Sequence, residues 1–168
     1  KLSHAATVGG NVCLALSAST FAPTMVALNA EYEIWRPNNE PYLVNAVDFQ
    51  TAPQQTILQP GEVLRKIKIP LGNLAQWQTS FKRMAVYTSG YAIAIVVTAY
   101  HPETQQVRFG ISGSVKSPQL IKFDTVPTPE QIVGVIRELP LHVYLDDERG
   151  SATYRRHITG LLMQHGIA

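Results

Sequence analysis

The sequence predicts an α+β fold built in two parts, and three patterns support this prediction. Residues 31–35 alternate polar and apolar side chains, as a half-buried strand does. From residue 77 onward, three runs rich in β-branched and aromatic residues predict a three-stranded antiparallel sheet, at residues 77–84, 92–100 and 107–113. The last third of the chain then changes to helical spacing. Strands followed by helices, without regular alternation of the two, indicate the α+β class.

Two helix starts define the helical last third. Thr128 is followed by a proline at the first helical position and by Gln131 three residues after the cap, so both side chains can bond amide groups of the first turn. Ser151 stands at the same place before a second helical pattern, which ends near Gly166. We therefore expect two helices after the predicted sheet.

The first part of the chain mixes short helices with strands. Residues 63–69 interleave apolar and basic side chains and predict a strand that ends at Pro70, whereas the polar residues 50–59 predict a loop. The stretch 71–76 contains a glycine and an asparagine, and we place the boundary between the two parts there. The predicted domains are residues 1–74 and residues 77–168.

Composition excludes several classes of function. Of the 168 residues, 45% are hydrophobic and 15% are charged, which is enough for a packed core. The net charge of +2 comes from scattered basic residues, so nucleic acid is not an expected partner. The longest apolar run, residues 91–100, is about half of the ~20 residues that a membrane helix needs, so no membrane span is predicted. The single cysteine, Cys13, excludes a four-cysteine iron–sulfur site and fits a reducing, cytoplasmic compartment.

The glycine pair Gly9–Gly10 is the first candidate for ligand binding. Two residues without Cβ atoms let the backbone turn sharply and let its amide groups approach an anion, and a helix after the turn adds the positive end of its dipole. Such a turn suits a pyrophosphate, and Thr7 and Asn11 add neutral donors and acceptors beside it. The same residues also suit a plain turn that caps a short helix, and their spacing does not separate the two interpretations.

Other polar residues carry no catalytic or metal-binding pattern. The five histidines lie far apart in the sequence, and Ser112 lacks the second glycine of a nucleophile elbow. We interpret residues 146–148 as a solvated acidic loop, and Arg155–Arg156 as a buried ion pair or a solvated helix face. Lys82 lies in the middle of a predicted strand, where a charge requires a wet face or a partner. No catalytic residue and no metal site are therefore predicted.

Several motifs in order resemble one family. Residues 6–11, Ala-Thr-Val-Gly-Gly-Asn, are similar to the second flavin-binding segment of the FAD-containing medium subunits of the xanthine dehydrogenase, carbon monoxide dehydrogenase and aldehyde oxidase family of molybdenum hydroxylases. The resemblance spans essentially the whole chain. Its further motifs are Pro23 with Met25-Val26-Ala27-Leu28-Asn29-Ala30, Val47-Asp48-Phe49, residues 58–64, Ile67-Lys68-Ile69-Pro70, Phe81-Lys82, Val107-Arg108 with Gly110, and Tyr154-Arg155-Arg156.

The resemblance implies a fold and a set of FAD contacts. The fold would be the second lobe of the FAD-binding domain, followed by the small C-terminal domain of a carbon monoxide dehydrogenase flavoprotein. The residues that this implies around FAD fall on the first lobe, with one exception on the predicted sheet. They are Thr7, Val8, Gly9, Gly10 and Asn11 at the pyrophosphate, Ser19 facing the flavin, Thr20 near the ribityl region, Leu64 against the isoalloxazine ring and Lys82 at its pyrimidine edge.

The resemblance also implies an activity in a larger assembly. Electrons would pass from a molybdenum cofactor on a large subunit, through iron–sulfur clusters on a small subunit, to this FAD and on to NAD or another acceptor. The chain starts at Lys1 without an initiating methionine, and the family's first glycine-rich flavin segment is missing from it. We therefore expect an oxidoreductase fragment that is inactive alone and binds FAD weakly or not at all.

Three departures from the family leave alternatives open. Leu16 stands where the family usually has a polar residue, Thr20 stands where it has a flavin-binding aspartate, and residues 87–90 replace an arginine and aspartate pattern. These changes motivate a second hypothesis, a flavin-free structural or interaction subunit. A flavoprotein related to the alcohol oxidases or cell-wall reductases is a third, but it would not account for Tyr154-Arg155-Arg156.

Overall fold

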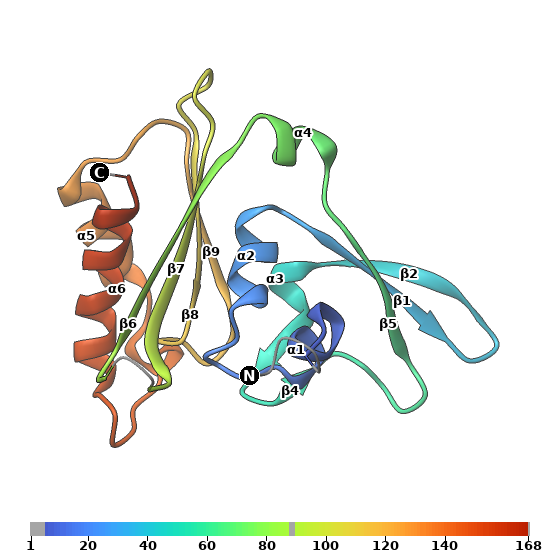
Figure 1. Cartoon of the computed structure of the whole chain (residues 1–168). Helices are drawn as coiled ribbons and strands as arrows, with labels where there is room; N and C mark the ends of the chain where they lie inside the picture. Colours follow the sequence, from blue (N-terminus) through green and yellow to red (C-terminus); the bar gives the residue numbers. More distant parts are fainter. Residues whose placement is uncertain (1–5, 88–89, 168) are drawn as a thin grey trace.

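Two antiparallel sheets, each with its own helices, organise the protein (Figure 1). The computed structural model describes residues 6–87 and 90–167. The first region contains α1 (Val8–Leu14), α2 (Phe21–Ala27), β1 (Glu31–Arg36), β2 (Asn39–Asn45), α3 (Ala46–Phe49), β3 (Gln50–Ala52), β4 (Gln55–Thr56) and β5 (Val63–Lys68). The second contains β6 (Gln78–Ala85), β7 (Ala92–Tyr100), β8 (Val107–Ser112), β9 (Gln119–Phe123), α5 (Pro129–Glu138), η1 (Leu141–Val143) and α6 (Ala152–Ile167), and α4 (Leu71–Ala75) joins the two.

The first sheet has the order β2-β1-β5 and is covered on one face only. Side chains of β1 alternate along the strand, so Tyr32 and Ile34 enter the core while Glu33 faces outward. Tyr32 meets the ring of Phe49 from α3 edge-on, at a centroid distance of 5.0 Å. The outer face carries the ion pairs of Glu33 with Arg65 and Lys68, both at 3.0 Å.

The second sheet has the order β6-β7-β8-β9 and is covered on both faces. Helix α6 lies on one face, and α2 of the first region packs on the other, against β7 and β8 (Figure 1). Every residue from 92 to 99 on β7 is therefore buried, because neither face of this strand meets solvent. A Cβ atom on Gly110 of β8 would lie 2.0 Å from the carbonyl oxygen of Pro23, so glycine allows α2 to approach the sheet this closely.

The α+β class is confirmed, with differences in single elements. The second sheet has a fourth strand, β9, which was not predicted from the sequence. Its five residues, 119–123, are too few to show a clear alternation of polar and apolar side chains. The predicted loop 50–59 contains the two short strands β3 and β4, and the predicted boundary 71–76 contains the helix α4. Strands this short depend on tertiary contacts, so local sequence signals are weak.

The predicted helix caps of the second region are present. Thr128 Oγ1 accepts the N–H of Gln131 at 3.3 Å, and Gln131 Oε1 accepts the N–H of Thr128 at 2.8 Å. Ser151 Oγ accepts the N–H of Tyr154 at 3.2 Å. The last helix continues through Gly166 instead of ending before it. Among the described residues, no helix combines the length and apolar character that a membrane crossing requires.

Candidate functional site

The glycine pair lies inside the first turn of α1. Thr7 is extended and is the N-cap, and its Oγ1 accepts the N–H of Gly10 at 3.0 Å. The predicted glycine turn before the helix is therefore wrong, because the threonine cap starts the helix at Val8. A Cβ on Gly10 would lie 2.9 Å from Thr7 Oγ1, whereas a Cβ on Gly9 would meet nothing within 4 Å. The backbone at Gly9 is thus open to an approaching ligand.

Asn11 connects the start of α1 with the start of α2. Its Oδ1 accepts a short hydrogen bond from Ser19 Oγ and another from the N–H of Phe21 at 3.3 Å. Ser19 is buried by this contact, while Thr20 beside it is exposed. The structure therefore brings the candidate residues Thr7 to Asn11, Ser19 and Thr20 to one corner of the first region.

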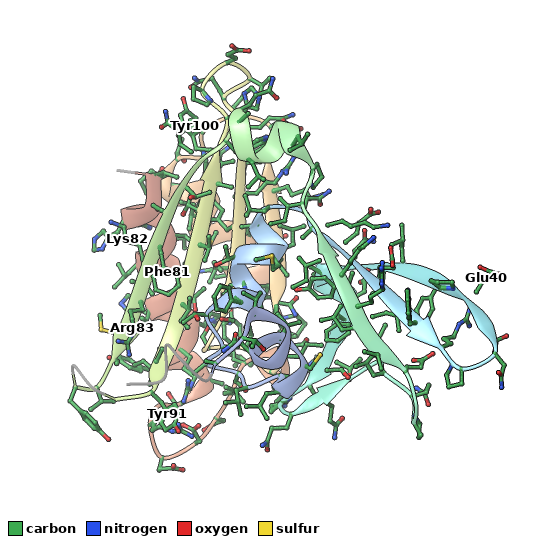
Figure 2. The ribbon with its side chains drawn as sticks, turned by 45° about the vertical axis from the view of Figure 1, so that its right-hand side comes forward. Glu40, Phe81, Lys82, Arg83, Tyr91 and Tyr100 are labelled. Carbon is green, nitrogen blue, oxygen red and sulfur yellow. The ribbon has the colours of Figure 1, made fainter. Side chains whose placement is uncertain are left out.

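The other two candidates lie elsewhere. Leu64 pairs with Ile34 and is half-buried against the core of the first region. Lys82 is on β6 and pairs with Val96 of β7. Val96 belongs to the core between the second sheet and its helices. Two residues earlier on the same face, Ser80 Oγ donates to the carbonyl of Gly166 in α6 at 3.2 Å. Lys82 thus lies on the α6 side of the edge strand, apart from the start of α1, and its role at a flavin stays a prediction (Figure 2).

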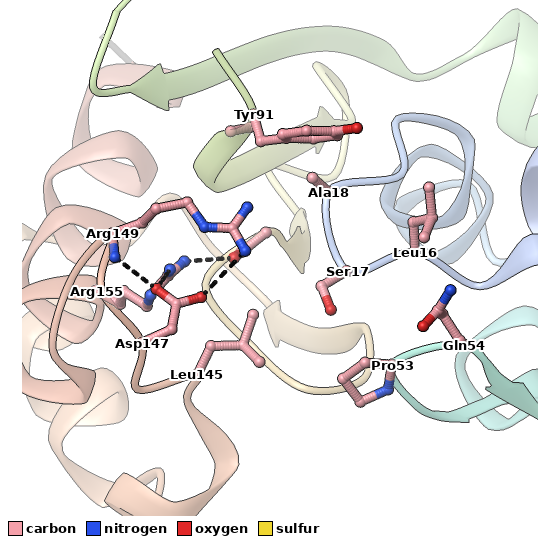
Figure 3. A pocket seen from close by; sticks show the side chains of 12 residues that line it. Leu16, Ser17, Ala18, Pro53, Gln54, Tyr91, Leu145, Asp147, Arg149 and Arg155 are labelled. Carbon is pink, nitrogen blue, oxygen red and sulfur yellow. Dashed lines mark hydrogen bonds and ion pairs between the residues drawn. The ribbon is translucent and has the colours of Figure 1, made fainter.

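A cavity of about 360 Å³ separates the two regions near this corner (Figure 3). One wall is the loop of Leu16, Ser17 and Ala18, which connects α1 with Ser19, together with the β3–β4 turn. The opposite wall belongs to the second region. It consists of Tyr91, Ala92, Gly113, Leu145, Asp147, Arg149 and Arg155.

The second wall carries one aromatic ring and three charges. Tyr91 is 70% exposed, and the guanidinium carbon of Arg149 lies 5.8 Å from the centre of its ring. Asp147 contacts Arg155 at 2.6 Å and Arg149 at 3.5 Å. Burial alone would raise the pKa of Asp147, but hydrogen bonds from the Arg155 side chain and the Arg149 backbone outweigh it and lower the pKa. Arg149 also contacts Glu148 at 3.7 Å, so the two arginines are paired with two carboxylates.

These wall residues were not predicted as site residues. The acidic residues 146–148 were interpreted as a solvated loop, but Asp147 is bound to two arginines. Of the two interpretations of Arg155, the buried ion pair is confirmed, because the side chain is 2% exposed. Tyr91 had no distinguishing signal, since it directly precedes a strand, β7, whose residues form core. No cluster of three metal-ligating side chains occurs within residues 6–87 and 90–167.

The donors and surfaces of this site fit a dinucleotide with a flat ring system. Amide groups at the open first turn of α1 suit phosphate oxygens, and the Thr7 and Asn11 side chains add neutral polar groups. The cavity beside them offers Leu16 and the exposed ring of Tyr91 as apolar surface. The site therefore has the chemistry that FAD requires.

Comparison with known proteins agrees with this chemistry. Residues 2–72 match the sequence model of a family described as the FAD binding domain in molybdopterin dehydrogenase. This first part of the chain is therefore similar to that FAD-binding family. The match covers the start of α1, the Ser19 loop and the β2-β1-β5 sheet, and it ends within α4.

Similarity to this family's proteins extends over nearly the whole chain. The chain is 22% identical to the carbon monoxide dehydrogenase medium chain of Afipia carboxidovorans, over 99% of this chain and 61% of that one. It is 24% identical to the glyceraldehyde dehydrogenase medium chain of Sulfolobus acidocaldarius, over 96% of this chain and 60% of that one.

The fold of the protein also has a counterpart among solved structures. Reconstituted CO dehydrogenase from Oligotropha carboxidovorans superimposes with a TM-score of 0.81 at 20% identity, over 98% of this chain and 60% of that chain. The chain thus spans about 60% of the length of the medium chains that it matches. The β2-β1-β5 sheet and the β6-β7-β8-β9 sheet both fall within the matched part.

Proposed function

We propose that this chain is part of the FAD-binding, electron-transfer component of a molybdenum hydroxylase. The observation that supports this proposal best is the corner at the start of α1. There Thr7 caps the helix, the backbone at Gly9 is accessible, and Asn11 accepts a hydrogen bond from Ser19. This corner lies in the segment that matches the FAD-binding family. A cavity with apolar and aromatic surface begins at the next loop, so phosphate and ring system would have adjoining places.

Each part of the site would have its own task. The first turn of α1 and the Thr7 and Asn11 side chains would hold the pyrophosphate, while Ser19 would keep Asn11 oriented. Tyr91 and Leu16 would exclude water from the ring system, and Arg149 would hold the Tyr91 ring in place through its contact with the ring face. When bound, FAD supplies the ability to accept and release electrons. For Leu64 and Lys82 we keep the proposed contacts with the flavin ring.

The partners follow from the names of the relatives. Two relatives are called medium chains, which indicates complexes with other chains. We propose a molybdopterin-binding large subunit and an iron–sulfur small subunit as partners, in the cytoplasm. Electrons would reach this chain from the iron–sulfur clusters and leave it to NAD or another acceptor.

A substitution at Gly9 tests the pyrophosphate site. Gly9→Asp adds a carboxylate where a side chain meets no protein atom, and negative charge at a helix start favours the helix. We expect the protein, purified with its partner chains, to keep its unfolding midpoint but to lose the visible absorbance of bound flavin. Gly9→Ala should retain more flavin than Gly9→Asp, because it adds no charge.

Gly134→Asp is the matched control, because Gly134 in α5 also has open space around a Cβ atom but lies far from the site. It should leave the flavin content unchanged. Full flavin retention by Gly9→Asp would contradict the proposed phosphate site.

A flavin-free structural subunit is the second candidate. The observation in its favour is that Thr20, exposed beside the Asn11–Ser19 contact, offers a hydroxyl group and no carboxylate. A colourless complex that assembles correctly would favour this function over electron transfer. A yellow complex whose colour depends on Gly9 would exclude it.

A further inference from the structure

Arg155 is buried in the wall of the inter-region cavity and binds three separate segments of the second region. Its Nη1 donates to the carbonyl oxygens of Ile93 and Gly113, both at 2.9 Å. Its Nε donates to the carbonyl of Gly150 at 3.1 Å, and its Nη2 donates to Asp147 Oδ1 at 2.6 Å. A buried guanidinium with all these contacts is held in one orientation by its fixed fork of donors.

Each of these segments carries part of the cavity wall. Ile93 follows Tyr91 by two residues, so its carbonyl fixes the start of β7 where the exposed ring stands. Asp147 and Gly150 bracket Arg149 in a turn closed by their own backbone hydrogen bonds. Both the Tyr91 ring and the turn that carries Arg149 are therefore positioned from Arg155 (Figure 3).

A chain of hydrogen bonds continues from Arg155 to the opposite wall. The N–H of Gly113, whose carbonyl binds Arg155, donates to the carbonyl of Ser17 at 2.6 Å. Gly113 has a φ of +74°, and a Cβ there would lie 3.1 Å from the backbone of Ile95, so this contact depends on glycine.

The neighbouring residues extend this link as far as α1. Ser112 Oγ donates to the carbonyl of Ser19 at 3.3 Å, and Ser19 Oγ donates to Asn11. The second region is thereby connected, through the Ser17–Ser19 loop, to the corner at the start of α1.

We propose that Arg155 is a positioning residue for the cavity between the two regions, holding both walls at the separation that a bound flavin ring needs. This inference rests on the proposed function for the identity of the ligand, but the link from Arg155 to Ser17 exists without a ligand. A lysine at this position has one compact ammonium group and cannot reproduce the fork of donors. The walls would then lose their common anchor.

The test compares Arg155→Lys with Thr159→Val in the protein purified with its partner chains. Thr159, one turn further along α6, is also buried and bonds Ser114 Oγ at 2.8 Å, but it does not line the cavity. Both variants lose a buried hydrogen bond of α6, so both should lower the unfolding midpoint. Arg156→Lys, at the half-buried neighbouring position, controls for the change of residue type.

Three readouts separate positioning from general stability. Amide hydrogen exchange of Gly113 should become at least about tenfold faster in Arg155→Lys, the size expected when a hydrogen bond to a charged group is lost. The dissociation constant for added FAD should rise by roughly tenfold, and the visible circular dichroism of the bound flavin should change. Thr159→Val and Arg156→Lys should leave all three close to wild type.

The outcomes distinguish this inference from the proposed function. Unchanged Gly113 exchange in Arg155→Lys, or an equal change in Thr159→Val, would overturn the positioning role. Wild-type protein that binds no FAD would overturn the proposed function, while accelerated Gly113 exchange in Arg155→Lys would still support the mechanical role. Changed exchange with unchanged FAD affinity and dichroism would show that the link does not serve the flavin, and would also overturn the inference.

Discussion

The β6–β9 sheet is buried on both faces, whereas the β2-β1-β5 sheet is buried on one. Residues 92–99 of β7 are buried without interruption, while β1 alternates and β2 and β5 expose most of their residues. The solvent-exposed face of the first sheet carries the ion pairs of Glu33 with Arg65 and Lys68. The difference indicates that the second region is the stable framework of the protein. The thinner first region carries all of the FAD contacts predicted from the sequence except Lys82.

The largest expected effect is the loss of a central side chain from the second core. Phe109 is fully buried, and its ring meets Phe123 edge-on at 6.1 Å. Phe109→Ala should lower the free energy of unfolding by about 3–5 kcal/mol, because it leaves a cavity in a closely packed core. Trp35→Ala on the first sheet should cost only about 1 kcal/mol, since Trp35 is 47% exposed and stacks with Arg65 at the surface. Urea unfolding of both variants measures this, and equal losses would break the comparison.

A methyl group at Gly110 tests the contact between the two regions. Gly110→Ala would force the backbone of α2 away from β8, because the new Cβ would lie 2.0 Å from Pro23 O. We expect a loss of about 1–3 kcal/mol, the usual cost of overpacking. The loss of stability, measured by thermal unfolding, shows how much the packing of α2 against the second sheet stabilises the protein. A neutral result would mean that the two regions separate more easily than their packing indicates.

Two threonine caps provide a matched pair, one in each region. Thr7→Ala removes the acceptor of the Gly10 N–H, and Thr128→Ala removes that of the Gln131 N–H. Each should lower stability by about 1 kcal/mol, the typical contribution of an N-cap side chain. Only Thr7→Ala should also weaken FAD binding, measured by titration of the deflavinated protein. Equal flavin affinity in the two variants would argue against a binding role for the α1 start.

The smallest effect concerns the ion pairs on the wet face of the first sheet. Hydrogen bonds from Lys68 and Arg65 lower the pKa of Glu33 from 4.5 to about 2. A lowered pKa in the folded state means that the stabilisation is complete above pH 4.5 and is lost as the pH falls toward 2. Glu33→Gln should therefore reduce stability slightly at pH 7 and flatten the decline between these two pH values. Unfolding midpoints from pH 7 to pH 2 measure it, and parallel curves for the two proteins would contradict the pKa shift.

Much of the fold could be predicted because local signals carried it. The long β7 run, the alternation of β1 and the Thr128 capping box depend on residues close in sequence, and all three are present in the structure. The strand β9 and the hairpin β3–β4 were missed, since such short pieces become strands only through their partners. The helix α1 begins earlier than predicted. The hydrogen bond from the Gly10 N–H to Thr7 Oγ1 stabilises its first turn, and this compensates for the low helix propensity of the two glycines.

The sequence by itself determined the α+β class, the family resemblance and the chemical character of the segment from Thr7 to Asn11. Only the tertiary structure decided that Tyr91, Asp147 and Arg149 face the loop after α1 across one cavity. It also placed Lys82 on the α6 side of its strand. The physical reason is that hydrogen-bonded links such as Arg155 to Gly113 to Ser17 join residues from distant parts of the chain, and no local pattern encodes such a pairing.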